Sequence, residues 1–167
     1  MGFVFLLLSS TEGWGSELCL AETKHSHAAV MGKCSDAYDK KDYETARREW
    51  EPLAKDGNSS AQFNLGYMYF RGQGVLQNNE TAVKWWRLAA EQGNADAQYN
   101  LGVMYGNGTG VIQDNVYAHM WWNIAASSGD EDASKNRDIV AGWMTPSQLE
   151  TAQRLARECV RKKYKGC

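Results

Sequence analysis

The side chains best suited to chemistry are few, and they gather near the two ends of the chain. Cys19, His25, His27 and Cys34 form a loose group in the N-terminal segment. Thiolate and imidazole are good zinc ligands, but a zinc site needs them in closely spaced, well-framed pairs, and this group lacks such spacing. We therefore expect a polar leader here, and we assign no metal ligand.

Cys159 and Cys167 form a second cysteine pair, at the C-terminal end. A straight helix over this separation rises about 12 Å, which exceeds the distance that a disulfide bridges. Gly166 and the polar residues before it favour a helix end and a reversal of the chain, which brings the two thiols together. A Cys159–Cys167 disulfide is therefore a hypothesis, and pairing of Cys19 with Cys34 is open as well.

Short catalytic motifs are absent from the sequence. It has no Ser-x-x-Lys, Lys-Thr-Gly, His-Glu-x-x-His or Gly-x-Ser-x-Gly arrangement, which excludes the usual signatures of several hydrolase classes. The stretch Gly106–Gly110 resembles a phosphate-cradling loop, but no Lys-Ser/Thr follows it. His119 is expected to be a partly exposed helix residue rather than a base. We predict no catalytic residue and no cofactor.

The composition indicates a globular helical protein of balanced charge. The 167 residues include 18 Lys+Arg against 20 Asp+Glu, a net charge of −2, which argues against nucleic acid as a partner. With 2 Pro the chain has room for long helices, and its 7 Trp supply rigid packing material. No run of residues is apolar enough to predict a transmembrane span.

Residues 1–21 are interpreted as an export signal or a disordered leader. The apolar run Gly2–Leu8 is too short to span a bilayer, and Gly15 and Ala21 offer small-residue cleavage points. The basic segment that normally precedes such a run is missing. We predict a periplasmic or secreted protein, with a cytoplasmic location as the alternative.

A shift of the sequence by 36 residues superimposes two long stretches of the chain. The matched residues in the first stretch are Ala61, Leu65, Gly66, Met68, Tyr69, Gly72, Gly74, Ala82, Trp85, Trp86, Ala89, Ala90 and Gly93. One step backwards, Ala46, Trp50, Ala54 and Gly57 form a partial third copy. So many identities at one offset indicate an internal repeat.

Each copy contains two apolar stripes at helical spacing, separated by a glycine-rich connector. The first stripe is represented by Ala61, Leu65 and Tyr69, and the second by Ala82 and Trp86. The connectors are expected at 71–79 and 106–115, where glycines permit positive φ. The pattern therefore predicts repeated helix–connector–helix units.

The period and the residues that carry it resemble the Sel-like repeat family, a subclass of the tetratricopeptide-like helical repeats. The resemblance rests on AQFNLGYMYFRGQGV, on AVKWWRLAAEQGNADAQYNLGVMYGNGTGV and on YAHMWWNIAASSGD, and it covers about residues 37–165. It implies a bacterial, exported protein with an all-α, right-handed αα-solenoid of antiparallel helix pairs and capping helices. Cysteine-rich members also show a seven-residue spacing between bonded cysteines, although within a repeat. The first copy, AYDKKDYETA, departs from the family pattern because it has only a short turn between its helices.

We predict a single helical repeat domain over residues 22–167, with about eight helices. Its expected parts are a cap pair at about 28–57, repeats at about 58–93 and 94–129, and a C-terminal helix pair at 130–165. The acidic start at Asp130 favours a helix that runs to about Trp143. Thr145, Pro146 and Gln148 predict an N-cap, a first-turn proline and a capping box for the last helix.

The resemblance implies a working surface, because the first helices of such repeats line the concave side of the solenoid. At 100° per residue, the face opposite the packing stripe holds Phe63, Tyr67, Phe70, Arg71, Tyr99, Val103 and Asn107. Aromatic residues beside an arginine are typical of binding hot spots. The alternative for Phe63 and Tyr99 is that they belong to the core between repeats.

We predict a non-catalytic, monomeric adaptor that binds a protein or peptide segment in the concave groove. The resemblance implies an enzyme-class alternative, because some cysteine-rich relatives are described as penicillin-binding or weakly β-lactam-hydrolysing. That alternative is a cell-envelope protein that binds, or weakly hydrolyses, β-lactam or peptidoglycan-like ligands. A third hypothesis is that the convex face stabilises a larger assembly.

Overall fold

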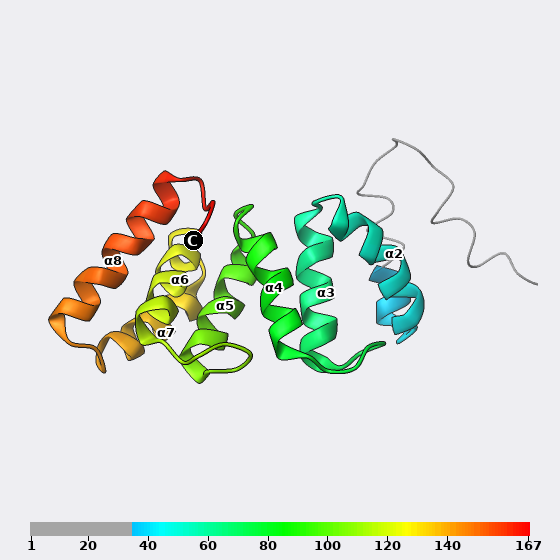
Figure 1. Cartoon of the computed structure of the whole chain (residues 1–167), viewed down its shortest axis with the longest axis horizontal. Helices are drawn as coiled ribbons and strands as arrows, with labels where there is room; N and C mark the ends of the chain where they lie inside the picture. Colours follow the sequence, from blue (N-terminus) through cyan, green and yellow to red (C-terminus); the bar gives the residue numbers. More distant parts are fainter. Residues whose placement is uncertain (1–34) are drawn as a thin grey trace, which may run out of the picture.

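Antiparallel helices stacked in one row make up residues 35–167, the part of the chain that the computed structural model describes (Figure 1). Helical residues 35–39 come first, and the helices that follow are α2 Tyr43–Lys55, α3 Ser59–Arg71, α4 Asn79–Ala90, α5 Ala95–Asn107, α6 Asn115–Ser127, α7 Glu131–Ala141 and α8 Pro146–Arg161. This part of the chain contains no strand, and none of its helices combines the length and apolarity needed to cross a bilayer. The prediction of an all-α solenoid is confirmed. The N-terminal cysteine and histidine group and the predicted leader lie outside the described residues.

The helix starts follow one local rule from α3 to α7. The residue before each of these helices turns its side-chain oxygen back onto a backbone N–H of the first turn, and the residues are Asn58, Asn78, Asn94, Asp114 and Asp130. Such N-caps satisfy donors that the helix leaves free. For α8 the predicted cap is confirmed: Thr145 and Gln148 form a capping box, and Pro146 stands in the first turn.

Within each repeat, a glycine of the first helix packs against a tryptophan of the second. A Cβ atom on Gly66 would lie 2.5 Å from Cδ1 of Trp86, and one on Gly102 would lie 2.5 Å from Nε1 of Trp122. Only glycine leaves room for the indole at these places. The repeated glycine therefore sets the close approach of α3 to α4 and of α5 to α6.

The two connectors are seated on the helix pair that precedes them. Gly74 and Gly110 have φ of 67° and 70°. A Cβ atom on Gly74 would lie 2.8 Å from the carbonyl oxygen of Tyr43, and one on Gly110 would lie 2.6 Å from that of Asn79. Each connector thus lies against the start of the preceding second helix. Because α3 and α5 continue through Arg71 and Asn107, the connectors are shorter than predicted.

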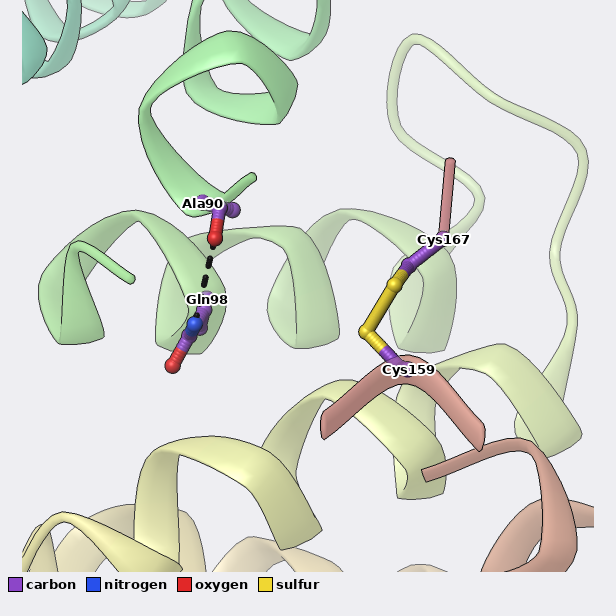
Figure 2. Close-up of a disulfide and its surroundings, with 4 residues drawn as sticks. All are labelled: Ala90, Gln98, Cys159 and Cys167. Atoms are coloured by element: carbon purple, nitrogen blue, oxygen red, sulfur yellow. Dashed lines mark hydrogen bonds between the residues drawn. A yellow bond between two sulfur atoms is a disulfide. The ribbon is translucent and has the colours of Figure 1, made fainter. Parts of the chain in front are cut away.

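Successive pairs are joined by a repeated side-chain hydrogen bond. The buried Gln62 amide donates to the carbonyl oxygen of Ala54 at 2.9 Å, and Gln98 donates to that of Ala90 at 3.2 Å (Figure 2). In both cases the acceptor lies at the end of the preceding second helix. The bond therefore ties each first helix to the pair before it, while satisfying a buried carbonyl group.

The C-terminal end is built around α6, which contacts α5, α7 and α8. Because these helices enclose α6 on several sides, most of its side chains are buried, including Met120, Trp121 and Ile124. The expectation that His119 is partly exposed is wrong: its side chain is 3 % exposed. Burial, reinforced by the nearby Arg137 guanidinium of α7, lowers the pKa of His119, and Asp138 opposes that effect.

Candidate functional site

Helical residues 35–39, α3, α5 and α7 are the first helices of successive pairs, and we call the surface they form the first-helix face. Two hollows lie on this face, one bordered by Trp50 and one by Trp122. Trp50, Trp86 and Trp122 follow one another at intervals of 36 residues, so they hold the same place in successive copies. The hollows are therefore related by the repeat, with the middle tryptophan between them.

The first hollow, of about 390 Å³, lies between residues 35–39 and α3. Its lining residues are Ser35, Tyr38, Asp39, Trp50, Phe63, Asn64 and Tyr67. The ring of Tyr38 packs on Trp50 with centroids 5.5 Å apart, and the Tyr38 hydroxyl donates a hydrogen bond to the Gln73 side chain. Burial, and then the neighbouring tyrosines, raise the pKa of Tyr38, so its phenol stays neutral at physiological pH.

Two of the predicted residues, Tyr67 and Arg71, form an exposed pair beside the first hollow. Tyr67 is 37 % exposed, and the Arg71 guanidinium carbon lies 6.0 Å from the centre of its ring. A cation over an aromatic face at this distance is a weak but favourable contact. The pair presents an aromatic edge and a positive charge together on the first-helix face.

Phe63 and Phe70 are half-buried and contribute to packing between helices. Phe70 lies against Trp86 with ring centroids 5.5 Å apart, and the Phe63 carbonyl accepts a hydrogen bond from the Trp86 indole at 3.1 Å. Both side chains also pack against the central hydrophobic core. Phe63 retains a surface on the first hollow, whereas Phe70 covers the middle tryptophan.

The second hollow, of about 300 Å³, lies between α5, α6 and α7. It brings together the predicted residues Tyr99, Val103 and Asn107 with residues of other helices, and its full lining is Tyr99, Val103, Gly106, Asn107, Asn115, Trp122, Asn136, Ile139, Val140 and Trp143. None of these side chains carries a charge. The Tyr99 hydroxyl accepts a hydrogen bond from the Asn136 amide at 3.2 Å, which joins α5 to α7 across the hollow.

The outer wall of the second hollow was not among the predicted site residues. Trp143 is 71 % exposed and Ile139 is 54 % exposed. Ile139 lies in the last turn of α7, and Trp143 follows just after the helix ends at Ala141. A helical-wheel projection of residues 131–143 places Ile139 and Trp143 on the same face as Asn136. The sequence therefore contained a signal for this wall.

A further hollow lies on the opposite side of the solenoid, on the outward face of α4. It measures about 440 Å³ and is lined by side chains of α4 and by the second connector, among them Lys84, Arg87 and Leu88. Leu88 is 46 % exposed there. This surface mixes positive, negative and aliphatic groups and holds none of the predicted site residues.

The side chains that line the hollows are suited to contacts with another molecule. Between residues 35 and 167, no group of three or more His, Cys, Asp or Glu side chains is arranged to hold a metal ion. Nδ1 of His119 is buried without a hydrogen-bond partner, and it borders neither hollow on the first-helix face. The hollows can hold apolar and aromatic groups by contact and can pair with polar groups through amides.

Cys159 and Cys167 are joined in the structure, with their sulfur atoms 2.02 Å apart (Figure 2). The chain reverses between them through positive φ at Lys163, Tyr164 and Gly166. The Tyr164 ring then lies beside Gly93, where an added Cβ atom would come within 3.2 Å of it. The C-terminal tail thus reaches from α8 back to the turn between α4 and α5.

Comparisons with known proteins agree with this architecture. The family described as Sel1 repeat matches residues 59–94 and 95–130. One similar solved structure is a protective antigen of uropathogenic Escherichia coli strains that displays an SLR fold, with 30% identity and a TM-score of 0.77 over 83% of this chain. Another is a Sel1 repeat protein from Oxalobacter formigenes, with 34% identity and a TM-score of 0.64 over 77% of this chain.

Both solved relatives are longer than this chain. The match covers 31% of the Escherichia coli antigen and 55% of the Oxalobacter formigenes protein. No protein with a curated description matches the sequence.

Proposed function

The chain is a Sel1 repeat protein, and on this premise we propose that it is a non-catalytic adaptor that holds an extended segment of a partner protein along its first-helix face. The observation that carries the proposal is the pair of hollows, of about 390 and 300 Å³, beside the equivalent tryptophans Trp50 and Trp122. Aromatic and aliphatic side chains around a concave site are the usual anchors of a bound segment. Since both hollows lie on one face, a single extended segment can engage both.

The two ends of this face offer a partner different chemistry. The Tyr67–Arg71 pair beside the first hollow suits an aromatic or acidic group, because it combines a ring with a positive charge. The second hollow has an uncharged lining in which asparagines accompany apolar side chains, so it suits an uncharged group that combines apolar and hydrogen-bonding atoms. The order of these two chemistries gives the bound segment a direction.

Affinity capture from a bacterial envelope fraction, with the purified chain immobilised, tests the adaptor. Three baits are compared: the unaltered chain, the double variant Tyr67→Ala/Arg71→Ala, and a control on the outward face of α4, Lys84→Ala/Leu88→Ala. We expect a protein that the unaltered chain and the control retain and the first-helix variant loses. Helicity by circular dichroism must be the same for all three, since the altered side chains are exposed.

Other outcomes oppose the proposal. Loss of the captured protein with only the α4 variant would place the working surface on the outward face. If neither variant alters capture, the partner binds neither through the altered residues of the first-helix face nor through those of the outward face of α4. Turnover of a chromogenic β-lactam above that of a heat-inactivated sample would contradict the non-catalytic part.

We also propose that the protein acts in the periplasm or outside the cell. The supporting observations are the apolar run Gly2–Leu8 and the Cys159–Cys167 disulfide, because disulfides persist in oxidising compartments. A thiol titration of the unfolded protein, purified from the native host without reductant, is expected to leave this pair unreacted. Reaction of both thiols, or recovery of the protein in the cytoplasmic fraction, would overturn the proposal.

A further inference from the structure

The three equivalent tryptophans differ in what covers them. The ring of Tyr38 packs on Trp50, and the ring of Phe70 packs on Trp86, with centroids 5.5 Å apart in each case. Both covering rings come from the end of the first helix of the same copy. Trp122 has no aromatic ring paired with it within residues 35–167, and it borders the second hollow instead.

The repeat alignment explains why Trp122, which is buried at 8 % exposure, has no aromatic ring packed on it. Gly106 stands in the second repeat where Phe70 stands in the first, and Val103 stands where Tyr67 stands. The first replacement removes the aromatic ring that packs on the tryptophan, and the second puts a smaller side chain in the lining of the second hollow. A Cβ atom on Gly106 would lie 3.0 Å from Cη2 of Trp122, so position 106 points directly at the indole. Gly106 and Trp122 both line the second hollow, which therefore lies beside the indole in the repeat that lacks the Phe70 ring.

The surroundings of this place select an uncharged aromatic group. Trp143 and Ile139 form an exposed outer wall, and Val103 and Val140 add aliphatic surface that cannot hydrogen-bond. Walls of this kind give an aromatic ring apolar contact. An aromatic ring beside an indole also gains the offset or tilted contact that the other two tryptophans already have.

The rim of the hollow suits a polypeptide. Asn107, Asn115 and Asn136 line it, and each side-chain amide offers a donor and an acceptor, as a peptide group does. No charged side chain competes for these groups in the lining. We propose that the second hollow is a socket for a phenylalanine or tyrosine side chain of an extended polypeptide, which packs on Trp122 as Phe70 packs on Trp86. This inference rests on the proposed adaptor function and names the chemistry of the partner segment.

Filling the socket from inside tests the inference. The variant Gly106→Phe gives the second repeat the residue of the first, at a helical position of α5 without positive φ. Its Cβ atom would lie 3.0 Å from Cη2 of Trp122, so the indole must shift slightly to admit the new side chain. The probe is the capped tripeptide acetyl-Gly-Phe-Gly-amide, followed by nitrogen-15 NMR of the tryptophan indole N–H groups. We expect the peptide to shift the signals of Trp122 and Trp143 in the unaltered chain, with binding at least about tenfold weaker in Gly106→Phe.

Two further variants keep the test decisive. Val103→Tyr restores the other ring that the first repeat holds, and it is expected to block the peptide in the same way even if Gly106→Phe does not fold. Lys84→Ala, on the outward face of α4, is the matched control and is expected to bind the peptide normally. Equal binding of acetyl-Gly-Leu-Gly-amide, shifts caused by chitobiose instead, or no shift at millimolar peptide would each overturn the aromatic socket.

These failures are distinguishable from failure of the adaptor. If Gly106→Phe still captures the protein that Tyr67→Ala/Arg71→Ala loses, the adaptor stands and the socket is wrong. If none of these variants alters capture, the first-helix face itself is excluded.

Discussion

The two repeats, residues 59–94 and 95–130, share their packing residues and differ at their surfaces. Leu65 and Leu101 are equally buried, and the glycine–tryptophan contact is present in both. On the first-helix face, by contrast, the Phe70 ring of the first repeat corresponds to Gly106 of the second, which borders the second hollow. The repeated residues therefore maintain the solenoid, while the variable ones decide what it can hold.

The outward faces of the second helices differ in the same way. Lys84 and Leu88 of α4 are exposed, whereas the equivalent Met120 and Ile124 of α6 are buried, and α8 packs on α6. Apolar side chains replace polar or exposed ones where a neighbouring helix covers the surface. The difference teaches that a repeat adapts to its neighbour through a few positions without altering its internal packing.

The largest expected effect comes from removing the equivalent tryptophans. Trp86→Ala is expected to cost about 3–5 kcal/mol of unfolding free energy, because a fully enclosed ring leaves a cavity. Trp122→Ala is expected to cost less by about 1 kcal/mol or more, since one side of this ring already borders a hollow. Urea denaturation followed by circular dichroism measures both. Equal costs would mean that the hollow does not relieve the packing around Trp122.

The connector glycines provide the next effect. Gly110→Ala is expected to cost about 3 kcal/mol, because it adds positive-φ strain to a clash with the Asn79 backbone. Gly129→Ala, also at positive φ but facing open space, is expected to cost about 1–2 kcal/mol. Thermal unfolding of the two variants gives the ranking. A larger loss for Gly129→Ala would show that the connector is not seated as described.

Val83 of the first repeat and His119 of the second hold equivalent positions, and only the second makes the stability of the protein depend on pH. The pKa of His119 is lowered in the folded protein, so the unfolded chain binds a proton first as the solution is acidified. His119 therefore leaves the free energy of unfolding unchanged above about pH 7 and lowers it increasingly as pH falls through about 6.5. His119→Val, which copies the first repeat, is expected to flatten this part of the stability profile. An unchanged slope between neutral and mildly acid pH would contradict the burial of His119.

The smallest effect is expected at the connector tips. Leu76 and Ile112 are 91 % and 90 % exposed, and they hold equivalent places in the two repeats. Replacement of either by Ser is expected to change the unfolding free energy by less than about 0.5 kcal/mol. Unaltered partner capture by both variants would keep this edge out of the binding surface, and a loss would extend that surface to the connectors.

Much of the fold was predictable because its determinants repeat in the sequence. The spacing of Trp86 and Trp122, the glycines of the connectors and the Thr145 capping box each report local structure or contacts between neighbouring helices. The position of His119 was not predictable in this way, because its burial depends on α7 covering α6. The spacing of apolar residues within α6 does not indicate which other helix will cover it.

The candidate site was predicted in part for a similar reason. Tyr67, Tyr99 and Val103 follow from the repeat geometry, and they border the two hollows. Ile139 and Trp143 were not predicted because they lie beyond the second repeat, where no residues identical to those of the repeats show which face of the helix is buried. The hollow itself arises from side chains that are small, and a pattern search that looks for large apolar residues passes over Gly106.

The seating of each connector on the preceding helix pair has a consequence for how such a chain can grow. Gly74 lies against Tyr43 and Gly110 against Asn79, so every 36-residue unit carries both a connector and the seat for the next one. In-frame duplication of one unit after residue 94 would thus supply its own junctions and lengthen the first-helix face by one tryptophan position. The C-terminal end does not offer this route, because α8 and its bonded tail make contacts that no internal unit reproduces. Gene duplication within the repeats can therefore lengthen the first-helix face while the terminal segment is inherited unchanged.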